Sequence, residues 1–228
     1  MTFHVLTLFP EVFAAASHSM IKRGVEDSKI VINVVNIRNF AINARGQTDA
    51  YPYGGGAGMV MMAQPIYNAY KSLNISNSRV IYLSPQGKRF DQAMANELSA
   101  EPEFVLLCGH YEGIDQRVID EIVTDEISLG DFVMTGGEIA AMAVIDAVGR
   151  LVPDVIKANS LIDESFSNGI LEYPQYTRPR SFMGRDVPEI LLSGHHAEIE
   201  KWRHERAIEA TRRKRPDLLD NLAEENNG

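Results

Sequence analysis

The sequence predicts an α/β fold with a mainly parallel sheet, followed by a small α-helical domain at the C-terminal end. Two observations support the sheet: apolar segments of strand length alternate with helical patterns, and these strand-like segments are rich in Val, Ile and Leu. A third, the change to a purely helical pattern after Pro188, supports the second domain. With 228 residues, 45% of them hydrophobic, the chain is long enough for one domain or two small ones.

Five short segments rich in Val, Ile and Leu are typical of buried strands. They are residues 2–9, 30–37, 80–83, 104–108 and 126–129. Helical patterns lie between or after them, at residues 64–73, 91–98, 115–122 and 138–150. Because strands that alternate with helices form parallel pairs, this order predicts the sheet.

Two segments interrupt the alternation and set the expected domain boundaries. Residues 50–62 are rich in glycine, and the polar residues 153–174 resemble a linker. Beyond Pro188, Ile199, Trp202 and Ala207 recur on one side of a helix, with basic residues between them. We therefore expect an α/β domain at 1–155, a linker at 156–173 and a helical domain at 174–228.

The composition excludes intrinsic disorder, collagen-like repeats and disulfide scaffolds. The apolar stretch 139–145 is far shorter than the roughly 20 residues of a membrane-spanning helix, so we expect no membrane partner. No secretory leader is visible at the start, and the single cysteine, Cys108, cannot form an intrachain disulfide. These features predict a cytoplasmic protein.

The formal net charge of −9 argues against indiscriminate binding to nucleic acid. Residues 195–215 differ from the rest, with seven Lys and Arg side chains against four Asp and Glu. A polyanionic partner would have to be held locally by this stretch. The alternative interpretation is an ordinary solvated helix face.

Three segments at predicted strand exits contain glycine, which allows a ligand to approach the backbone closely. They are residues 83–89, 109–115 and 129–138. Since ligands of open α/β sheets bind where loops leave the carboxyl ends of strands, these segments predict a site for a nucleoside-like cofactor.

Standard phosphate and metal motifs are absent. Met59 occupies the position of the last glycine of a dinucleotide fingerprint, and Tyr82 stands where a P-loop ending at Gly87-Lys88 needs glycine. The six histidines show no metal-ligand spacing with Cys108 or a carboxylate, so the residues predict no metal site.

Six motifs together resemble the bacterial tRNA (guanine-N1)-methyltransferases, the TrmD family of the SPOUT superfamily. They are Pro52 to Met59, Tyr82 to Gly87, Cys108 to Asp115, Gly136 to Glu138, Pro174 to Pro179 and Leu191 to Arg203. The resemblance spans nearly the whole chain. It implies a SPOUT-type fold with a deep trefoil knot, S-adenosylmethionine as cofactor, a homodimer, and tRNA as substrate, methylated at N1 of the guanosine immediately 3′ of the anticodon.

The resemblance also assigns binding residues. The cofactor residues it implies are Tyr82, Leu83, Ser84, Pro85, Gln86, Gly87, Gly109, Tyr111, Glu112, Gly113, Leu129, Gly130, Asp131, Phe132, Val133, Met134, Gly136 and Gly137. The substrate residues it implies are Gly55, Gly56, Arg178, His195, Arg212, Arg213, Lys214 and Arg215. The basic helical residues would mainly contact phosphate and set the register of the tRNA.

The reaction needs a base for the N1 proton and a cation near the adjacent oxygen, where negative charge develops. The resemblance places the cation at Arg150 and the base just before Ser165-Phe166, which gives Glu164 where the family commonly has aspartate. Asp163 is the adjacent alternative. Taken alone, Arg150 would be an ordinary cation at a helix end and Glu164 a solvated acid.

Other positions depart from the family pattern, namely Ala50, Ala57, His110, Gln116 and Ala140. The family implies a divalent cation, Mg²⁺, but the sequence contains no dedicated ligand cluster. Two rival functions are a SPOUT methyltransferase for another RNA base and a non-catalytic RNA-binding protein. The second predicts loss of Arg150 or of both linker carboxylates, and all three residues are present.

Overall fold

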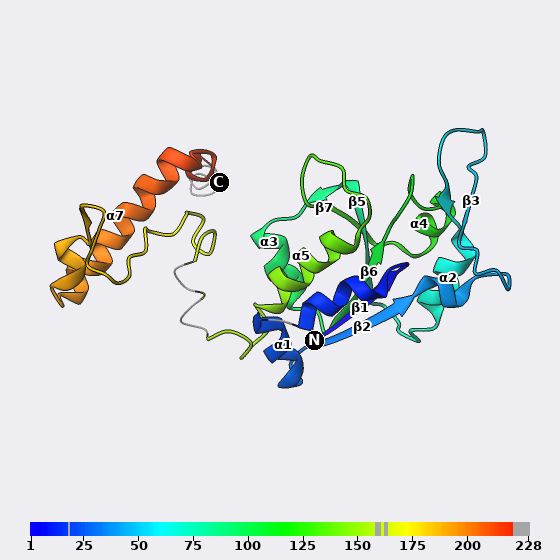
Figure 1. Cartoon of the computed structure of the whole chain (residues 1–228), viewed down its shortest axis with the longest axis horizontal. Helices are drawn as coiled ribbons and strands as arrows, with labels where there is room; N and C mark the ends of the chain where they lie inside the picture. Colours follow the sequence, from blue (N-terminus) through cyan, green and yellow to red (C-terminus); the bar gives the residue numbers. More distant parts are fainter. Residues whose placement is uncertain (18, 158–160, 162–163, 221–228) are drawn as a thin grey trace. The chain divides into compact units, whose positions relative to one another are not determined.

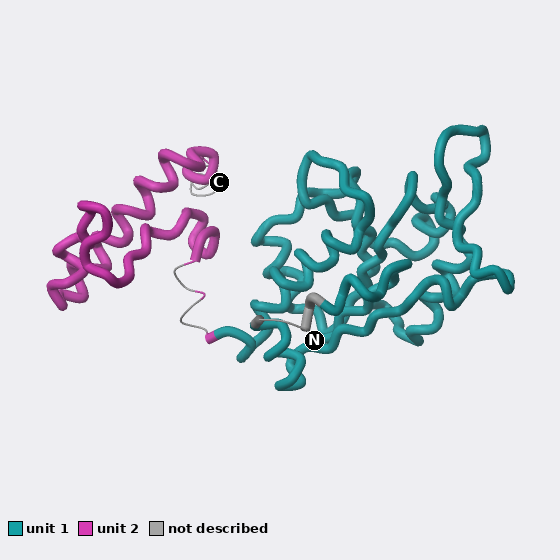
Figure 2. The backbone as a smooth tube through the Cα atoms, viewed as in Figure 1, with its two compact units in different colours: residues 1–156 teal, residues 157–228 magenta. Residues whose placement is uncertain are grey.

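The computed structural model describes residues 1–17, 19–157, 161 and 164–220. The chain forms two compact units, Met1–Ile156 and Lys157–Gly228 (Figure 2). The division falls one residue beyond the end of the first predicted domain, and the described residues 164–173 of the predicted linker belong to the second unit. Within the described ranges, no helix is long and apolar enough to cross a membrane.

A five-stranded parallel sheet forms the centre of the first unit, with the strand order β2-β1-β6-β5-β7 (Figure 1). Each strand corresponds to one of the five apolar segments of the sequence. The bounds are Thr2–Thr7 for β1, Val31–Asn36 for β2, Arg79–Arg89 for β5, Glu103–Cys108 for β6 and Asp125–Ser128 for β7. The predicted α/β fold with a mainly parallel sheet is confirmed.

Side chains alternate between the two faces of the sheet, as the pleat of a strand requires. In β6, Phe104 and Leu106 pack on one face, whereas Val105 and Leu107 pack on the other. Helices cover both faces, so the strands are apolar on both sides. The first face carries α1 (Ser19–Glu26), α3 (Gln92–Ser99) and α5 (Glu138–Gly149), and the second carries α2 (Ala63–Lys71) and α4 (Gln116–Ile122) (Figure 1).

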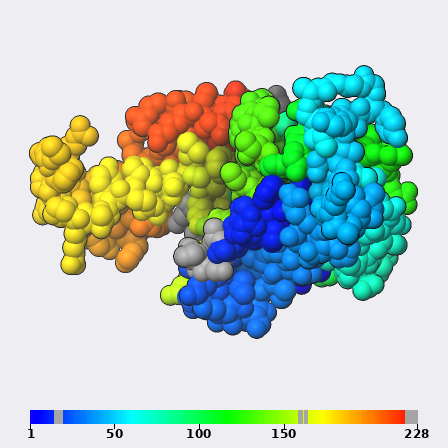
Figure 3. Space-filling view, turned by 45° about the vertical axis from the view of Figure 1, so that its right-hand side comes forward, coloured from blue at the N-terminus to red at the C-terminus, as the bar shows by residue number. Residues whose placement is uncertain are grey.

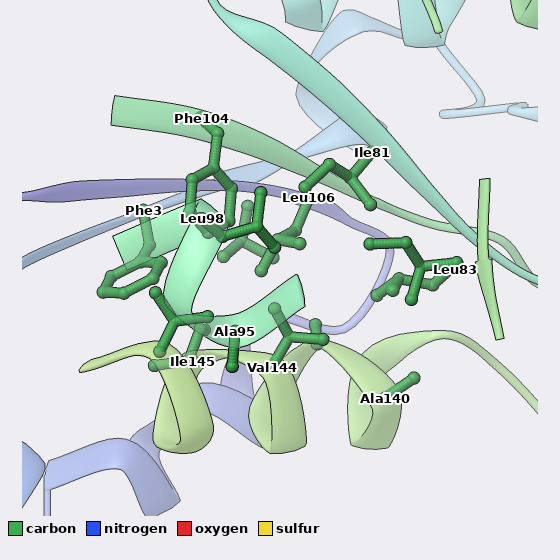
Figure 4. Packing of buried hydrophobic residues seen from close by; sticks show 14 of the residues in the cluster. Phe3, Ile81, Leu83, Ala95, Leu98, Phe104, Leu106, Ala140, Val144 and Ile145 are labelled. Carbon is green, nitrogen blue, oxygen red and sulfur yellow. The ribbon is translucent and has the colours of Figure 1, made fainter. Parts of the chain in front are cut away.

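The first face holds the larger core (Figure 4). Phe3 and Phe104 meet edge to face at 5.2 Å, above Val144 and Ile145 of α5. Burying one such side chain contributes about 2 kcal/mol, so this packing fixes α5 on the sheet. The position of α5 matters because its first residues lie at the carboxyl ends of the strands.

Residues 10–29 received no element in the sequence analysis, but they include the 3₁₀ helix η1 (Pro10–Ser17) and α1. Gly24 weakens the helical pattern of α1 in the sequence. In the structure, a Cβ at Gly24 would lie only 2.9 Å from Cδ1 of Ile30. Glycine therefore serves close packing of α1 rather than a break in the helix.

Strand β5 is longer than the predicted 80–83. Both Leu83 and Lys88 lie opposite Ile127 of β7, so residues 84–87 leave the ladder and the chain then returns to it. The predicted loop 83–89 is therefore an excursion within a strand, and both of its ends are fixed by the same neighbour.

The second unit is built on one long helix, α7 (His196–Lys214), preceded by the 3₁₀ helix η3 (Glu189–Leu192). A short hairpin of β8 (Ser181–Phe182) and β9 (Arg185–Asp186) lies before them. The predicted linker packs on α7, since the backbone N–H of Leu171 donates to Oγ1 of Thr211 at 2.9 Å and Arg203 lies over the Tyr173 ring. Helix α7 thus positions the segment that follows Glu164.

Candidate cofactor pocket and active-site residues

A cavity of about 280 Å³ lies at the carboxyl ends of β5, β6 and β7. The three glycine-containing segments of the sequence analysis form its walls, as expected for an open α/β sheet. Its lining residues are Tyr82, Leu83, Ser84, Pro85, Gln86, Gly109, His110, Tyr111, Glu112, Gly113, Ile127, Ser128, Leu129, Gly130, Phe132, Val133, Met134, Thr135, Gly136, Gly137 and Ala140.

Two of the expected cofactor residues, Gly87 and Asp131, do not line this cavity. A Cβ at Gly87 would lie 2.4 Å from the carbonyl carbon of Glu126, so this glycine allows β5 to return to β7. Asp131 is exposed to solvent. The lining residues that are not among the expected cofactor residues are His110, Ile127, Ser128, Thr135 and Ala140.

Backbone contact between β6 and α5 closes one wall of the pocket. A Cβ at Gly137 would lie 2.8 Å from Cα of Cys108, and the N–H of Gly137 donates to the carbonyl oxygen of Gly109 at 2.9 Å. No side chain fits between the two segments. This wall of the pocket is therefore backbone rather than side chain, which allows a ligand to approach the main chain closely.

Tyr82 is a buried aromatic residue in the wall formed by β5. Burial, followed by the negative charge of Glu126 directly opposite in β7, raises the pKa of the Tyr82 hydroxyl. The hydroxyl therefore stays protonated near neutral pH and can donate a hydrogen bond to a ligand.

Glu138 begins α5 beneath the pocket and is only 6% exposed. The hydroxyl of the fully buried Thr7 donates to its Oε1 at 2.7 Å. The other oxygen lies near Gly136 and near Nδ1 of His110, because a Cβ at Gly136 would be 2.5 Å from each of these two atoms. Nδ1 of His110 is buried and has no hydrogen-bond partner in the described part of the chain.

The loop that carries Gly55 and Gly56 is tied to the pocket. It connects the short strands β3 (Asp49–Ala50) and β4 (Val60–Met61) and lies on the surface (cyan in Figure 3). The N–H of Glu112 donates to Met59, and the N–H of Met61 donates to Gly113, both across to the pocket segment. A substrate on this loop would lie beside the cofactor.

Arg150 lies at the opposite end of α5 from the pocket, as its C-cap residue. The helix begins at Glu138 and its residue Ala140 still lines the pocket, so about 15 Å of helix separates Arg150 from the pocket wall at 1.5 Å per residue. Within the first unit of a single chain, Arg150 and the pocket are therefore not adjacent.

Glu164 lies in the second unit, at a smaller cavity of about 140 Å³. The cavity is also lined by Tyr173 and by Arg203 and His204 of α7. Arg203 stacks over the Tyr173 ring at 4.9 Å and donates to Glu200 at 2.8 Å. Asp163, the alternative base, lies outside the described residues.

The expected substrate residues of the second unit are exposed: Arg178, His195, Arg212, Arg213, Lys214 and Arg215. Arg215 differs from its neighbours, because it donates to Asp217 at 2.6 Å and lies over the Phe166 ring. The hydrogen bond to Asp217 raises the pKa of Arg215 further above its usual value. Asp217 therefore already balances part of the positive charge of Arg215 within the chain.

Comparison with known proteins gives full-length matches. A family model described as tRNA (Guanine-1)-methyltransferase TrmD matches residues 1–221. A tRNA (guanine-N(1)-)-methyltransferase of Exiguobacterium sibiricum is 58% identical over 221 residues, covering 96% of this chain and 91% of that protein. Proteins of the same name from Alkaliphilus oremlandii and Clostridioides difficile are 55% and 52% identical, covering 96% of this chain in each case and 92% and 97% of the relatives. The matches extend across both units.

Proposed function

Since the chain belongs to the tRNA (guanine-1)-methyltransferase TrmD family and methylates N1 of guanine in tRNA, we propose that its methyl donor is S-adenosylmethionine and its acceptor is the guanosine immediately 3′ of the anticodon. The family match over residues 1–221 is the observation that carries this proposal. As in the family, we expect a deep trefoil knot, a homodimer and a cytoplasmic location.

The pocket in the first unit has the features that S-adenosylmethionine requires. Backbone groups at Gly109 and Gly137 form a wall with no side chain between them, and Tyr82 supplies a protonated hydroxyl. The buried Nδ1 of His110 lacks a partner among the described residues and can bond a polar group of a ligand. When bound, S-adenosylmethionine supplies an electrophilic methyl group on a sulfonium.

The protein must remove the N1 proton of guanine and stabilise the anion that forms. A carboxylate removes the proton, and Glu164 has the family spacing to Ser165-Phe166. Asp163 is the alternative. The guanidinium of Arg150 would stabilise the negative charge on the neighbouring oxygen.

We propose that these groups meet the cofactor between two chains. Arg150 is separated from the pocket of its own unit by most of the length of α5. A second copy of the chain can bring its own Arg150 or Glu164 to that pocket. A closed two-fold dimer would create two such sites.

A role for Mg²⁺ has no counterpart in the side chains. Across residues 1–17, 19–157, 161 and 164–220, no group of three or more His, Cys, Asp or Glu residues could hold a metal ion. We therefore derive no step through a metal.

The proposal is tested with isotopically labelled S-adenosylmethionine and an unmodified tRNA transcript, followed by identification of the labelled nucleoside and its position. We expect labelled 1-methylguanosine immediately 3′ of the anticodon. A transcript with adenosine at that position is the matched control and should stay unlabelled. Label in another nucleoside, or at another guanosine, would refute the proposed acceptor.

A further inference from the structure

Three carboxylates lie in the wall of the pocket or close behind it. Among the described lining residues there is no Lys or Arg, and Glu112 supplies a carboxylate. Glu138 lies beneath the pocket and forms no ion pair with a described Lys or Arg. Glu126 lies behind Tyr82, on the adjacent strand.

Burial of Glu138 carries a large desolvation free energy. Desolvation of a carboxylate costs several kcal/mol unless donors compensate, and among the described side chains the hydroxyl of Thr7 donates to it. The carboxylate also sits at the N-terminus of the 12-residue helix α5. That helix end carries a partial positive charge of roughly half an elementary charge, which the carboxylate offsets.

Without this carboxylate, the positive end of α5 would face the pocket through Gly136 and Gly137. A positive field there would disfavour a cationic ligand. Burial, and after it the negative charge of Glu138, raise the pKa of the Cys108 thiol. Burial and then the negative charge of Glu126 likewise raise the pKa of the Tyr82 hydroxyl.

We propose that Glu138 and Glu126 make the pocket selective for a sulfonium over a neutral thioether. The inference rests on the proposed function, in which the cofactor is S-adenosylmethionine. On transfer, the sulfur–methyl bond breaks, its electron pair stays on sulfur, and the methyl group bonds to N1 while the N1 proton goes to the base. The cofactor thereby loses one positive charge, and the field that held it no longer favours the product.

A purely structural role for Glu138, as a cap for α5, makes a different prediction. Loss of a cap would loosen the pocket for both ligands and would lower their affinities together. Only an electrostatic role changes the ratio of the two affinities, because S-adenosylmethionine and S-adenosylhomocysteine differ by the methyl group and one positive charge.

The test is a calorimetric measurement of both dissociation constants in the full-length protein and in Glu138→Gln and Glu126→Gln. Each substitution keeps the size of the side chain and one acceptor oxygen, replaces the other oxygen by an NH2 donor and removes the charge. We expect the ratio of the S-adenosylhomocysteine constant to the S-adenosylmethionine constant to fall about three- to tenfold in each variant. Glu26→Gln on α1, the matched control away from the pocket, should leave the ratio unchanged.

The outcomes separate the two proposals. An unchanged ratio in folded variants overturns the selectivity role and leaves the cofactor assignment intact. If Glu138→Gln does not fold, Glu126→Gln alone decides by the same criterion. Failure of the unsubstituted protein to bind S-adenosylmethionine would refute the proposed cofactor, and the selectivity role with it.

Discussion

The two candidate ligand-binding regions of this chain are built in opposite ways. The pocket in the first unit is made of buried strand ends and of glycines that bring backbone against backbone, as at Gly137 and Cys108. The basic end of α7 in the second unit is made of long, exposed side chains on one helix. A single added methyl group should therefore damage the first region, whereas the second should respond only to the loss of charges.

The largest effect is expected at Glu164, which belongs to the second unit but would act on the chemistry rather than on binding. We expect Glu164→Gln to lower the methylation rate by about two orders of magnitude or more, with little change in S-adenosylmethionine affinity. Asp163→Asn should have a modest effect. Single-turnover rates and cofactor titrations of both variants provide the check.

The reverse ranking would transfer the role of base to Asp163. Small and equal effects from the two variants would mean that neither carboxylate takes the proton.

The next largest effect tests the basic end of α7. Replacing Arg212, Arg213 and Lys214 by alanine should weaken tRNA binding at least about tenfold and reduce its salt dependence, because fewer counterions are released on binding. Affinity for S-adenosylmethionine should not change. Alanine at Lys22 and Arg23 of α1 is the matched control. Unchanged tRNA affinity in the triple variant would make this stretch an ordinary solvated helix face.

A single methyl group tests the pocket. Gly137→Ala would place a Cβ 2.8 Å from Cα of Cys108, so we expect a loss of about 1–3 kcal/mol in unfolding free energy and weaker cofactor binding. In Gly55→Ala, the new Cβ has open space around it, so the expected loss is only the cost of a positive φ for alanine, about 1 kcal/mol. Denaturant titrations compare the two. An equal and small loss would show that the β6–α5 contact has room to relax.

The smallest effect concerns pH and one ion pair in each unit. The hydrogen bond from Arg79 lowers the pKa of Asp125, so this pair stabilises the first unit above the unfolded pKa of about 3.9, and the stabilisation is lost as the pH falls through the folded value. Arg79→Met should flatten this loss in thermal melts below pH 5.

In the second unit, Asp217→Asn should leave the melting temperature unchanged, since Arg215 and Asp217 are both exposed.

A loss of stability at low pH that is as steep in Arg79→Met as in the unsubstituted protein would assign the pH dependence to other carboxylates.

The sheet and the walls of the pocket were predictable because both depend on local patterns. Apolar segments of strand length mark the strands, and glycine at three strand exits marks the loops. His110 is not among the expected cofactor residues, although the predicted segment 109–115 contains it between Gly109 and Tyr111. The partner of Arg215 was also visible, two residues further along the chain, as Asp217.

Other features have no local signal. Gly24 resembles a helix breaker until its contact with Ile30 is known. The distance between Arg150 and the pocket follows from the direction of α5, which depends on packing against the sheet. Whether two chains complete one active site is a property of an assembly and leaves no periodic pattern in a single sequence.

The central claim, that one active site takes Arg150 and the linker carboxylate from two different chains, is tested most directly by mixing two inactive variants. One chain carries Arg150→Ala, and the other carries both Asp163→Ala and Glu164→Ala. After subunit exchange, methylation should return to about a quarter of the unsubstituted rate, because half of randomly mixed dimers are hybrids and each hybrid has one complete site of two. If hybrids form and no activity returns, Arg150 and the carboxylate act from the same chain, and the claim is contradicted.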